Sequence, residues 1–302
     1  HVPVAQQLLL LGVIMLLIFG TGYTSKVLLG KSESPKTSIP VLDREAGGNA
    51  PTQEASAASF ADLEIVAQSA FVWDIQKQRV LYEKNPDQQL PLASITKLMT
   101  ALVAHELLAG RAPIEVTTDA IKQDGTSGLS AGESFDLTSL TDLTLLTSSN
   151  DGAFALAAAA GSLLTPSGDA STFVEAMNIR ADELGLSQTY YRNPTGLDIT
   201  ETEAGAYGSA RDVAFLMEYI LQHNPDIIER TKDTSVAVYN ELGVFHEATN
   251  TNPAVSRIAG LIGSKTGYTE LAGGNLTVAF DAAPNRPIVV VALGSTYQDR
   301  FS

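Results

Sequence analysis

The chain has 302 residues and contains no cysteine. Disulfides, thiolate metal ligands and a cysteine nucleophile are therefore excluded. Histidine is also scarce, with four residues, and no H-E-x-x-H zinc motif occurs. We expect these histidines to be packing or surface residues, and we expect the protein to use no metal and no cofactor.

Positive charge is scarce as well, since 19 Lys and Arg residues face 34 Asp and Glu residues and the net charge is −15. A protein that binds nucleic acid needs a basic footprint, so this balance argues against nucleic acid as a partner. The apolar fraction of 44 % is ordinary for a folded protein and excludes a chain that is disordered throughout.

The first 30 residues differ from the rest of the chain. No charged residue occurs from Val2 to Ser25, and apolar residues dominate between Leu8 and Phe19. A membrane-spanning helix needs roughly 20 apolar residues, so residues 1–30 are predicted to be a membrane anchor. A cleaved signal segment is the alternative interpretation, because such segments also contain a short apolar core.

Residues 31–59 are rich in Ser, Pro and Gly and lack a sustained apolar period, which predicts a flexible linker. Residues 60–302 are predicted to form the folded domain. An apolar segment, a polar linker and a folded domain in this order are typical of a protein that is tethered to the cell membrane with its domain on the outer side.

Within the folded domain, strands are expected at both ends and helices between them. The terminal strands are expected to pair into one sheet, while the middle forms a separate helical lobe with a binding cleft between the two. The expected strands are 67–73, 79–82, 258–265, 275–281 and 288–293, and the expected helices are 94–108, 137–146, 153–164, 173–184 and 211–222.

The first motif that can carry chemistry is Ser94-Ile95-Thr96-Lys97, at the predicted start of a helix. Residues three apart on a helix lie on one face, so Ser94 and Lys97 can meet. Serine is a weak nucleophile until a base removes its proton, and a lysine can act as that base when burial or a neighbouring cation lowers its pKa. An S-x-x-K sequence alone is common, however, and equally fits a helix cap with an exposed lysine.

Two further motifs follow in the chain, Ser148-Ser149-Asn150 between two helices and Lys265-Thr266-Gly267 at a strand. Each has an ordinary structural explanation when taken alone, such as an N-cap cluster or a strand that ends in a turn. The three in this order and context are the S-x-x-K, S-x-N and K-T-G pattern of penicillin-binding proteins and class A β-lactamases.

The residues around these motifs extend the resemblance. The chain from Ser69 onward is similar to the low-molecular-mass penicillin-binding proteins, the serine-type D-alanyl-D-alanine carboxypeptidases. The resemblance implies an α+β fold in which an antiparallel sheet is flanked by helices and contains an inserted helical lobe. The segments that carry it are 92–100, 148–151, 192–197 and 263–269.

This family resemblance implies the role of each residue in the motifs. Ser94 would be acylated, with Lys97 as the general base. Ser148 would relay a proton to the leaving amine with help from Lys265. Asn150 would hold the substrate's amide carbonyl and orient Lys97.

The segment from Thr266 through Gly267 to Thr269 would border the substrate. Thr266 and Thr269 would bind its terminal carboxylate. The backbone N–H groups of Ser94 and Tyr268 would form the oxyanion hole.

The implied function is removal of the terminal D-Ala from peptidoglycan stem peptides through an acyl-enzyme on Ser94, with β-lactam antibiotics as covalent inhibitors. A D,D-endopeptidase that cleaves crosslinks is the first alternative, because both reactions use the same groups. A non-catalytic cell-wall-binding protein is another, although no catalytic residue is missing.

A class A β-lactamase is the remaining alternative. It would need a glutamate that activates a deacylating water, normally in a Glu-x-x-Leu-Asn segment, and none occurs between the second and third motifs. Ser149 also stands where such enzymes usually have Asp. The glutamates that are present have other neighbours: Glu175, Glu183, Glu201 and Glu203.

Overall fold

The computed structural model describes residues 64–108, 110, 113–125 and 127–301. The predicted anchor, 1–30, and the predicted linker, 31–59, lie outside these residues. Among the helices of the described part of the chain, none has both the length and the apolar character that are needed to cross a bilayer.

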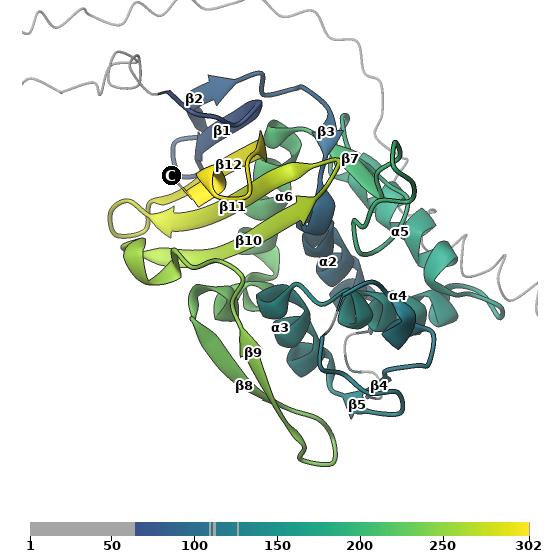
Figure 1. Ribbon diagram of the computed structural model, residues 1–302. Helices are drawn as coiled ribbons and strands as arrows, with labels where there is room; N and C mark the ends of the chain where they lie inside the picture. The colour runs from purple at the N-terminus through teal and green to yellow at the C-terminus, as the bar shows by residue number, and fades with distance from the viewer. Residues whose placement is uncertain (1–63, 109, 111–112, 126, 302) are drawn as a thin grey trace, which may run out of the picture. The chain divides into compact units, whose positions relative to one another are not determined.

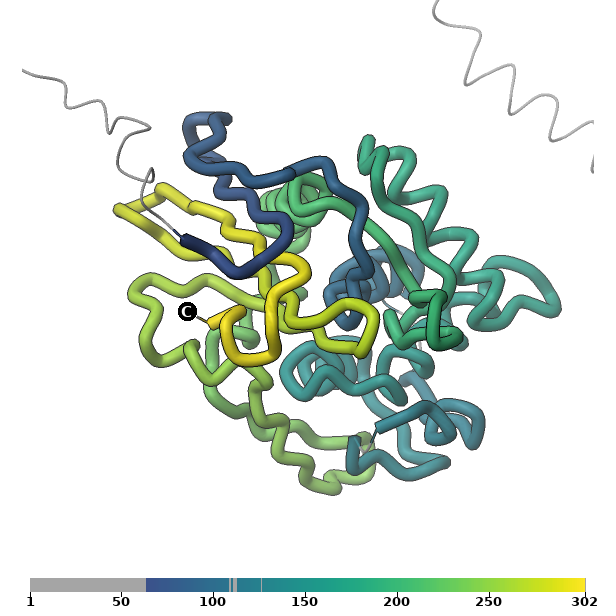
Figure 2. Tube along the Cα trace, turned by 45° about the horizontal axis from the view of Figure 1, so that its top comes forward, coloured from purple at the N-terminus to yellow at the C-terminus, as the bar shows by residue number. Residues whose placement is uncertain are grey.

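A five-stranded antiparallel sheet joins the two ends of the described chain. Its strand order is β10-β11-β12-β1-β2, so the first strand pairs with the last (Figures 1 and 2). Phe71 of β1 lies opposite Val291 of β12, and both side chains are fully buried. The prediction that terminal strands form one sheet is therefore confirmed. The strands are β1 Ser69–Asp74, β2 Arg79–Lys84, β10 Leu261–Thr269, β11 Gly273–Asp281 and β12 Pro287–Ser295.

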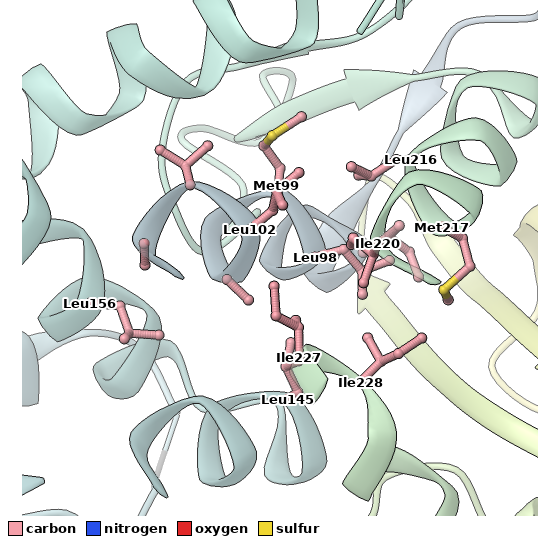
Figure 3. Packing of buried hydrophobic residues seen from close by; sticks show 14 of the residues in the cluster. Leu98, Met99, Leu102, Leu145, Leu156, Leu216, Met217, Ile220, Ile227 and Ile228 are labelled. Atoms are coloured by element: carbon pink, nitrogen blue, oxygen red, sulfur yellow. The ribbon is translucent and has the colours of Figure 1, made fainter. Parts of the chain in front are cut away.

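Helix α2, Lys97–Leu108, lies at the centre of the domain. Its first eight residues are all buried, and a helix that is enclosed on all sides needs no polar face. Leu98 lies close to Ile220 of helix α6, Ala210–His223, in the core (Figure 3). Helix α6 in turn packs against β1 and β12, so the apolar core connects the sheet to the helical lobe.

The helical lobe consists of α3 Leu137–Thr147, α4 Asn150–Leu164 and α5 Ala170–Glu183, which pack around α2. Each of the three begins at a side-chain cap, which satisfies backbone N–H groups that have no partner within the helix. Asp136, Ser149 and Asp169 are these caps.

The helical lobe and the sheet together make the α+β fold that the motifs predicted, and several boundaries differ from the prediction. The expected helix 94–108 begins with a 3-10 turn over Ala93–Thr96. The expected strand 258–265 is displaced to Leu261–Thr269, so the third motif lies inside a strand and not at its end.

Short strands were not predicted. The β8–β9 hairpin, Ser235–Tyr239 and Phe245–Thr249, packs beside α3. The other short strands have two or three residues, which is too few to show an alternating pattern. They are β3 Leu90–Pro91, β4 Ile114–Glu115, β5 Ser134–Phe135, β6 Tyr190–Tyr191 and β7 Ala206–Gly208.

Two glycines with the same backbone conformation give a test of how tightly the loop before β7 is packed. Gly196 has φ +79°, and a Cβ there would lie 1.9 Å from the carbonyl oxygen of Ala93. Gly243, in the β8–β9 turn, has φ +78° with nothing within 4 Å of such a Cβ. Gly243→Ala should therefore lower the free energy of unfolding by about 1 kcal/mol through its backbone alone. Gly196→Ala should lower it by about 2–4 kcal/mol because overpacking is added.

Urea denaturation of the two variants measures this difference. Equal losses of unfolding free energy would contradict the close approach between Gly196 and the turn that carries Ser94.

Candidate active site

Ser94 lies on a strained turn between β3 and α2. The preceding residue, Ala93, has φ +47°, a left-handed conformation that side chains other than glycine rarely adopt. The turn is held by the sheet, because Asn275 of β11 donates from its side-chain amide to the carbonyl oxygens of Pro91 at 2.9 Å and Leu92 at 3.1 Å. Ser94 itself is half-buried, so its hydroxyl stays accessible while the backbone of the turn is held in place.

Lys97 is fully buried and has three oxygen neighbours. Its Nζ lies 2.8 Å from Ser94 Oγ, 2.7 Å from Asn150 Oδ1 and 2.8 Å from the carbonyl oxygen of Thr195. A neutral amine has two N–H donors and one lone pair. With the donors directed at Asn150 and Thr195, the lone pair faces the hydroxyl of Ser94, which is the arrangement that a general base requires.

Electrostatics favour this neutral form. Burial holds the pKa of Lys97 well below its usual range, and the nearby positive charge of Lys265 lowers the pKa further. The lysine therefore becomes neutral at a lower pH than an exposed lysine does, which favours its action as a base.

A second Ser–Lys pair faces the first. Ser148 has φ +60° in the two-residue connection between α3 and α4, and its Oγ accepts a hydrogen bond from Lys265 Nζ at 2.9 Å. Ser149 next to it caps α4 by accepting from the N–H of Gly152, which fixes the connection. The left-handed conformation turns the side chain of Ser148 away from the helix and toward β10.

Lys265 is also almost completely buried, with 1 % of its surface exposed. Burial, with a smaller contribution from the Arg300 guanidinium, lowers the pKa of Lys265 to about 7. The pKa of Lys97 is lowered by burial and by the charge of Lys265. Burial therefore acts on both lysines of the site in the same direction, toward the neutral amine.

Strand β10 brings the third motif against the nucleophile. A Cβ at Gly267 would lie 2.9 Å from the carbonyl oxygen of Leu92 and 3.2 Å from the backbone nitrogen of Ser94, so a larger residue would push the strand away. β10 is the edge strand of the sheet, which leaves the backbone groups on its outer side free of sheet partners. The N–H groups of Ser94 and Tyr268 were predicted to form an oxyanion hole, and the close approach at Gly267 places these two segments together.

The two predicted carboxylate-binding threonines both have partners within the protein. Thr266 is 4 % exposed, and its hydroxyl lies 2.6 Å from that of Thr251. The Thr269 hydroxyl donates to Asp198 Oδ1 at 2.9 Å. The backbone carbonyl of Thr266 accepts a hydrogen bond from Lys265 Nζ at 2.8 Å, whereas Thr269 is engaged by the loop that contains Thr195. The side chain of Tyr268 is 44 % exposed at the rim.

Four further contributors were missed by the sequence prediction. The carbonyl of Thr195 contacts Lys97, Thr251 contacts Thr266, and Asp198 contacts Thr269. Arg300, 6 % exposed, donates to the carbonyl oxygen of Gly267 at 2.6 Å and so braces β10. Only the segment around Thr195 gave a signal, as part of the family resemblance; a backbone carbonyl is not encoded by residue type.

One other serine has a recognisable spacing. Gly128-Leu129-Ser130-Ala131-Gly132 fits the G-x-S-x-G pattern of α/β-hydrolases, which requires a strand–turn–helix context. Ser130 instead lies exposed in a loop before β5, so the spacing is coincidental. Within the described residues, no group of three His, Asp or Glu side chains is arranged to hold a metal.

An antiparallel sheet joined to a helical lobe, with two Ser–Lys pairs where they meet, defines the class of serine peptidases that share the penicillin-binding fold. Residues 52–296 match the family described as D-alanyl-D-alanine carboxypeptidase. The chain belongs to this family.

Known relatives differ in what they cleave. The chain is 31 % identical over 245 residues to the D-alanyl-D-alanine carboxypeptidase DacF of Bacillus subtilis, covering 79 % of this chain and 60 % of that protein. It is 30 % identical over 237 residues to a D-alanyl-D-alanine endopeptidase of Pseudomonas aeruginosa, covering 76 % of this chain and 73 % of that protein. The chain thus spans three-fifths of the length of DacF.

A solved structure agrees with the fold. Penicillin-binding protein D2 of Listeria monocytogenes, in its ampicillin-bound form, has a TM-score of 0.64 and 26 % identity to this chain. The match covers 80 % of this chain and 94 % of that one.

Lys97→Arg should abolish acylation of Ser94, because a guanidinium stays protonated and cannot accept the serine proton. Lys97→Met, which removes the amine and keeps the length of the side chain, should have the same effect. Covalent labelling by a fluorescent penicillin measures the reaction, with Ser94→Ala as the unlabelled reference. Near-normal labelling rates in either Lys97 variant would show that another group is the base.

Proposed function

We propose that the protein is a serine-type D-alanyl-D-alanine carboxypeptidase that removes the terminal D-Ala from peptidoglycan stem peptides. The observation that carries this proposal is the buried amine of Lys97, 2.8 Å from Ser94 Oγ. Membership of the carboxypeptidase family supports the same reaction.

Acylation begins when the substrate lies along β10 with its scissile carbonyl oxygen toward the N–H groups of Ser94 and Tyr268. Ser94 Oγ attacks the carbonyl carbon while Lys97 Nζ takes the hydroxyl proton. The resulting tetrahedral oxyanion is stabilised by the two N–H groups.

The C–N bond then breaks. The leaving amine of D-Ala receives a proton from the hydroxyl of Ser148, whose Oγ is hydrogen-bonded to Lys265 Nζ. Ser148 takes in its place the proton that Lys97 removed from Ser94, so Lys97 is neutral again before deacylation. The products of this step are free D-Ala and an ester on Ser94. A water molecule attacks the ester in the second half of the reaction, Lys97 takes its proton, and Ser94 is regenerated with release of the shortened peptide.

The charges of the site suit a substrate with a terminal carboxylate. Lys265 of the third motif and Arg300 are both buried. Lys265 is bonded to Ser148, and Arg300 is bonded to the carbonyl of Gly267. Neither has a carboxylate partner among the residues that the structure describes, and two unpaired buried cations are unfavourable in the free protein. A bound carboxylate would offset that cost, which favours a peptide with a free C-terminus over one that continues.

The endopeptidase alternative remains open because two relatives, from Pseudomonas aeruginosa and Escherichia coli, have that name. A β-lactamase is less well supported. Glu183 and Glu203, two of the four glutamates considered for the missing base, are bonded to Arg180 and Arg192. The leaving group of a penicillin stays tethered to the ester on Ser94, whereas D-Ala departs and leaves room for water, so the penicillin ester should persist. The ampicillin-bound form of the Listeria relative supports β-lactams as ligands of this site.

Incubation of the purified protein with a pentapeptide that ends in D-Ala-D-Ala should release one equivalent of D-Ala per peptide. The reason is that Lys265 and Arg300 favour a free terminal carboxylate. Chromatographic quantification of D-Ala and of the tetrapeptide measures the reaction, with Ser94→Ala as the inactive control.

Two outcomes would redirect the assignment. Cleavage of crosslinked muropeptides with no release of D-Ala from the pentapeptide would indicate an endopeptidase. A penicillin adduct on Ser94 that disappears within seconds, with many equivalents of drug hydrolysed, would indicate a β-lactamase.

We also propose that the catalytic domain lies on the outer side of the cell membrane, held there by residues 1–30. The uncharged segment Val2–Ser25 and the polar linker after it support this arrangement, as does a cell-wall substrate. Cell fractionation should recover the full chain with the membrane, and high salt should not release it. Recovery in the soluble extracytoplasmic fraction, with the first 25 residues missing, would show a cleaved signal segment instead.

A further inference from the structure

The side-chain amide of Asn150 is fixed from both of its ends. Its Oδ1 accepts from Lys97 Nζ at 2.7 Å, and its Nδ2 donates to the carbonyl oxygen of Asp124 at 2.6 Å. The two ends of an amide are not equivalent, since one accepts and the other donates. The carbonyl of Asp124 therefore decides that the oxygen, and not the nitrogen, faces the catalytic lysine.

Asp124 belongs to a surface segment that is hydrogen-bonded to Asp151, the residue after Asn150. Asp151 follows Asn150 in the first turn of α4 and is 5 % exposed. Its Oδ2 accepts a hydrogen bond from the hydroxyl of Ser127, three residues after Asp124. Ser127 Oγ also accepts from the N–H of Leu129 at 3.4 Å, so the same hydroxyl organises the segment locally.

Nothing else that the structure describes bonds the carboxylate of Asp151. Its Oδ1 is buried and has no hydrogen-bond partner among the described residues. A buried, half-satisfied carboxylate is unfavourable for folding, although its place at a helix N-terminus offsets part of that cost. The contact with Ser127 is therefore a second polar link between the start of α4 and the segment that carries Asp124, beside the bond from Asn150 Nδ2.

We propose that Asp151 and Ser127 are positioning residues for acylation, because they hold the Asp124 carbonyl against Asn150 and so keep Asn150 Oδ1 directed at Lys97. The proposal rests on the proposed function of Lys97 as the base. If the amide of Asn150 turned over, Nδ2 would donate to the lone pair of Lys97. That lone pair must accept the proton of Ser94, so the turned amide would block the base.

The test measures the second-order rate of penicillin acylation in the full chain, as a function of pH. Ser127→Ala and Asp151→Ala should each slow acylation by roughly 10- to 100-fold, the size of effect expected when a reacting group is misplaced. Asp151→Asn keeps an acceptor oxygen for Ser127 and should stay within about threefold of the wild type. Ser127→Thr keeps the hydroxyl and should also retain activity. Ser130→Ala is the matched control. Ser130 lies on the same segment, its hydroxyl makes no hydrogen bond within the described residues, and its loss should not change the rate.

The pH profile distinguishes a loss of the Asn150 orientation from a general destabilisation of the domain. Acylation needs neutral Lys97, so the rate falls as pH drops through the pKa of that lysine. The charged group that acts on Lys97 is Lys265, which none of these variants touches. Loss of Asn150 Oδ1 as an acceptor disfavours the ammonium form of Lys97. Ser127→Ala should therefore move the acid limb of the profile, the pH range in which the acylation rate falls, to lower pH.

Three results would overturn the proposal. They are a Ser127→Ala variant that acylates like the wild type, an acid limb that stays in place or moves to higher pH, and an Asp151→Asn variant that is as slow as Asp151→Ala. Absence of acylation in the wild type itself would instead refute the proposed function.

Discussion

The burial of Lys97 is the constraint on which the rest of the site depends. An amine with no exposed surface must either find partners for a charge or lose its proton, and here it has only neutral oxygens around it: a hydroxyl, an amide and a peptide carbonyl. Each comes from a different part of the chain. The turn before α2, the start of α4 and the loop before β7 must therefore all be in place before the lysine can act as a base.

Close backbone packing is what brings these parts together. Gly267 lets β10 approach the turn that carries Ser94, and Gly196 lets the loop of Thr195 approach the same turn. Asn275 ties the turn to the sheet. The strain at Ala93 persists because packing on several sides leaves the turn no alternative conformation.

The sequence predicted the parts of the site that are encoded by residue type at short spacing. Ser94 and Lys97 are neighbours on one turn, and the terminal strands show the apolar pattern of a sheet. Both features could therefore be predicted from short stretches of sequence. The contacts of Thr195, Thr251 and Arg300 were not, because each depends on a tertiary approach between residues that are far apart in the chain. The 3-10 turn at Ala93–Thr96 was missed for the same reason, since sheet contacts impose it on residues with ordinary helix patterning.

The two buried lysines also affect how long Lys97 keeps the proton that it takes from Ser94. Burial lowers the pKa of Lys265 to about 7, and burial together with the charge of Lys265 lowers the pKa of Lys97 well below its usual range. When Lys97 takes the proton of Ser94, two ammonium groups lie in one buried site, which is unfavourable. Transfer of a proton through Ser148 to the departing amine removes the excess charge. Return of the proton to Ser94 would relieve the same repulsion, so the forward direction is favoured only when D-Ala leaves the site with the transferred proton.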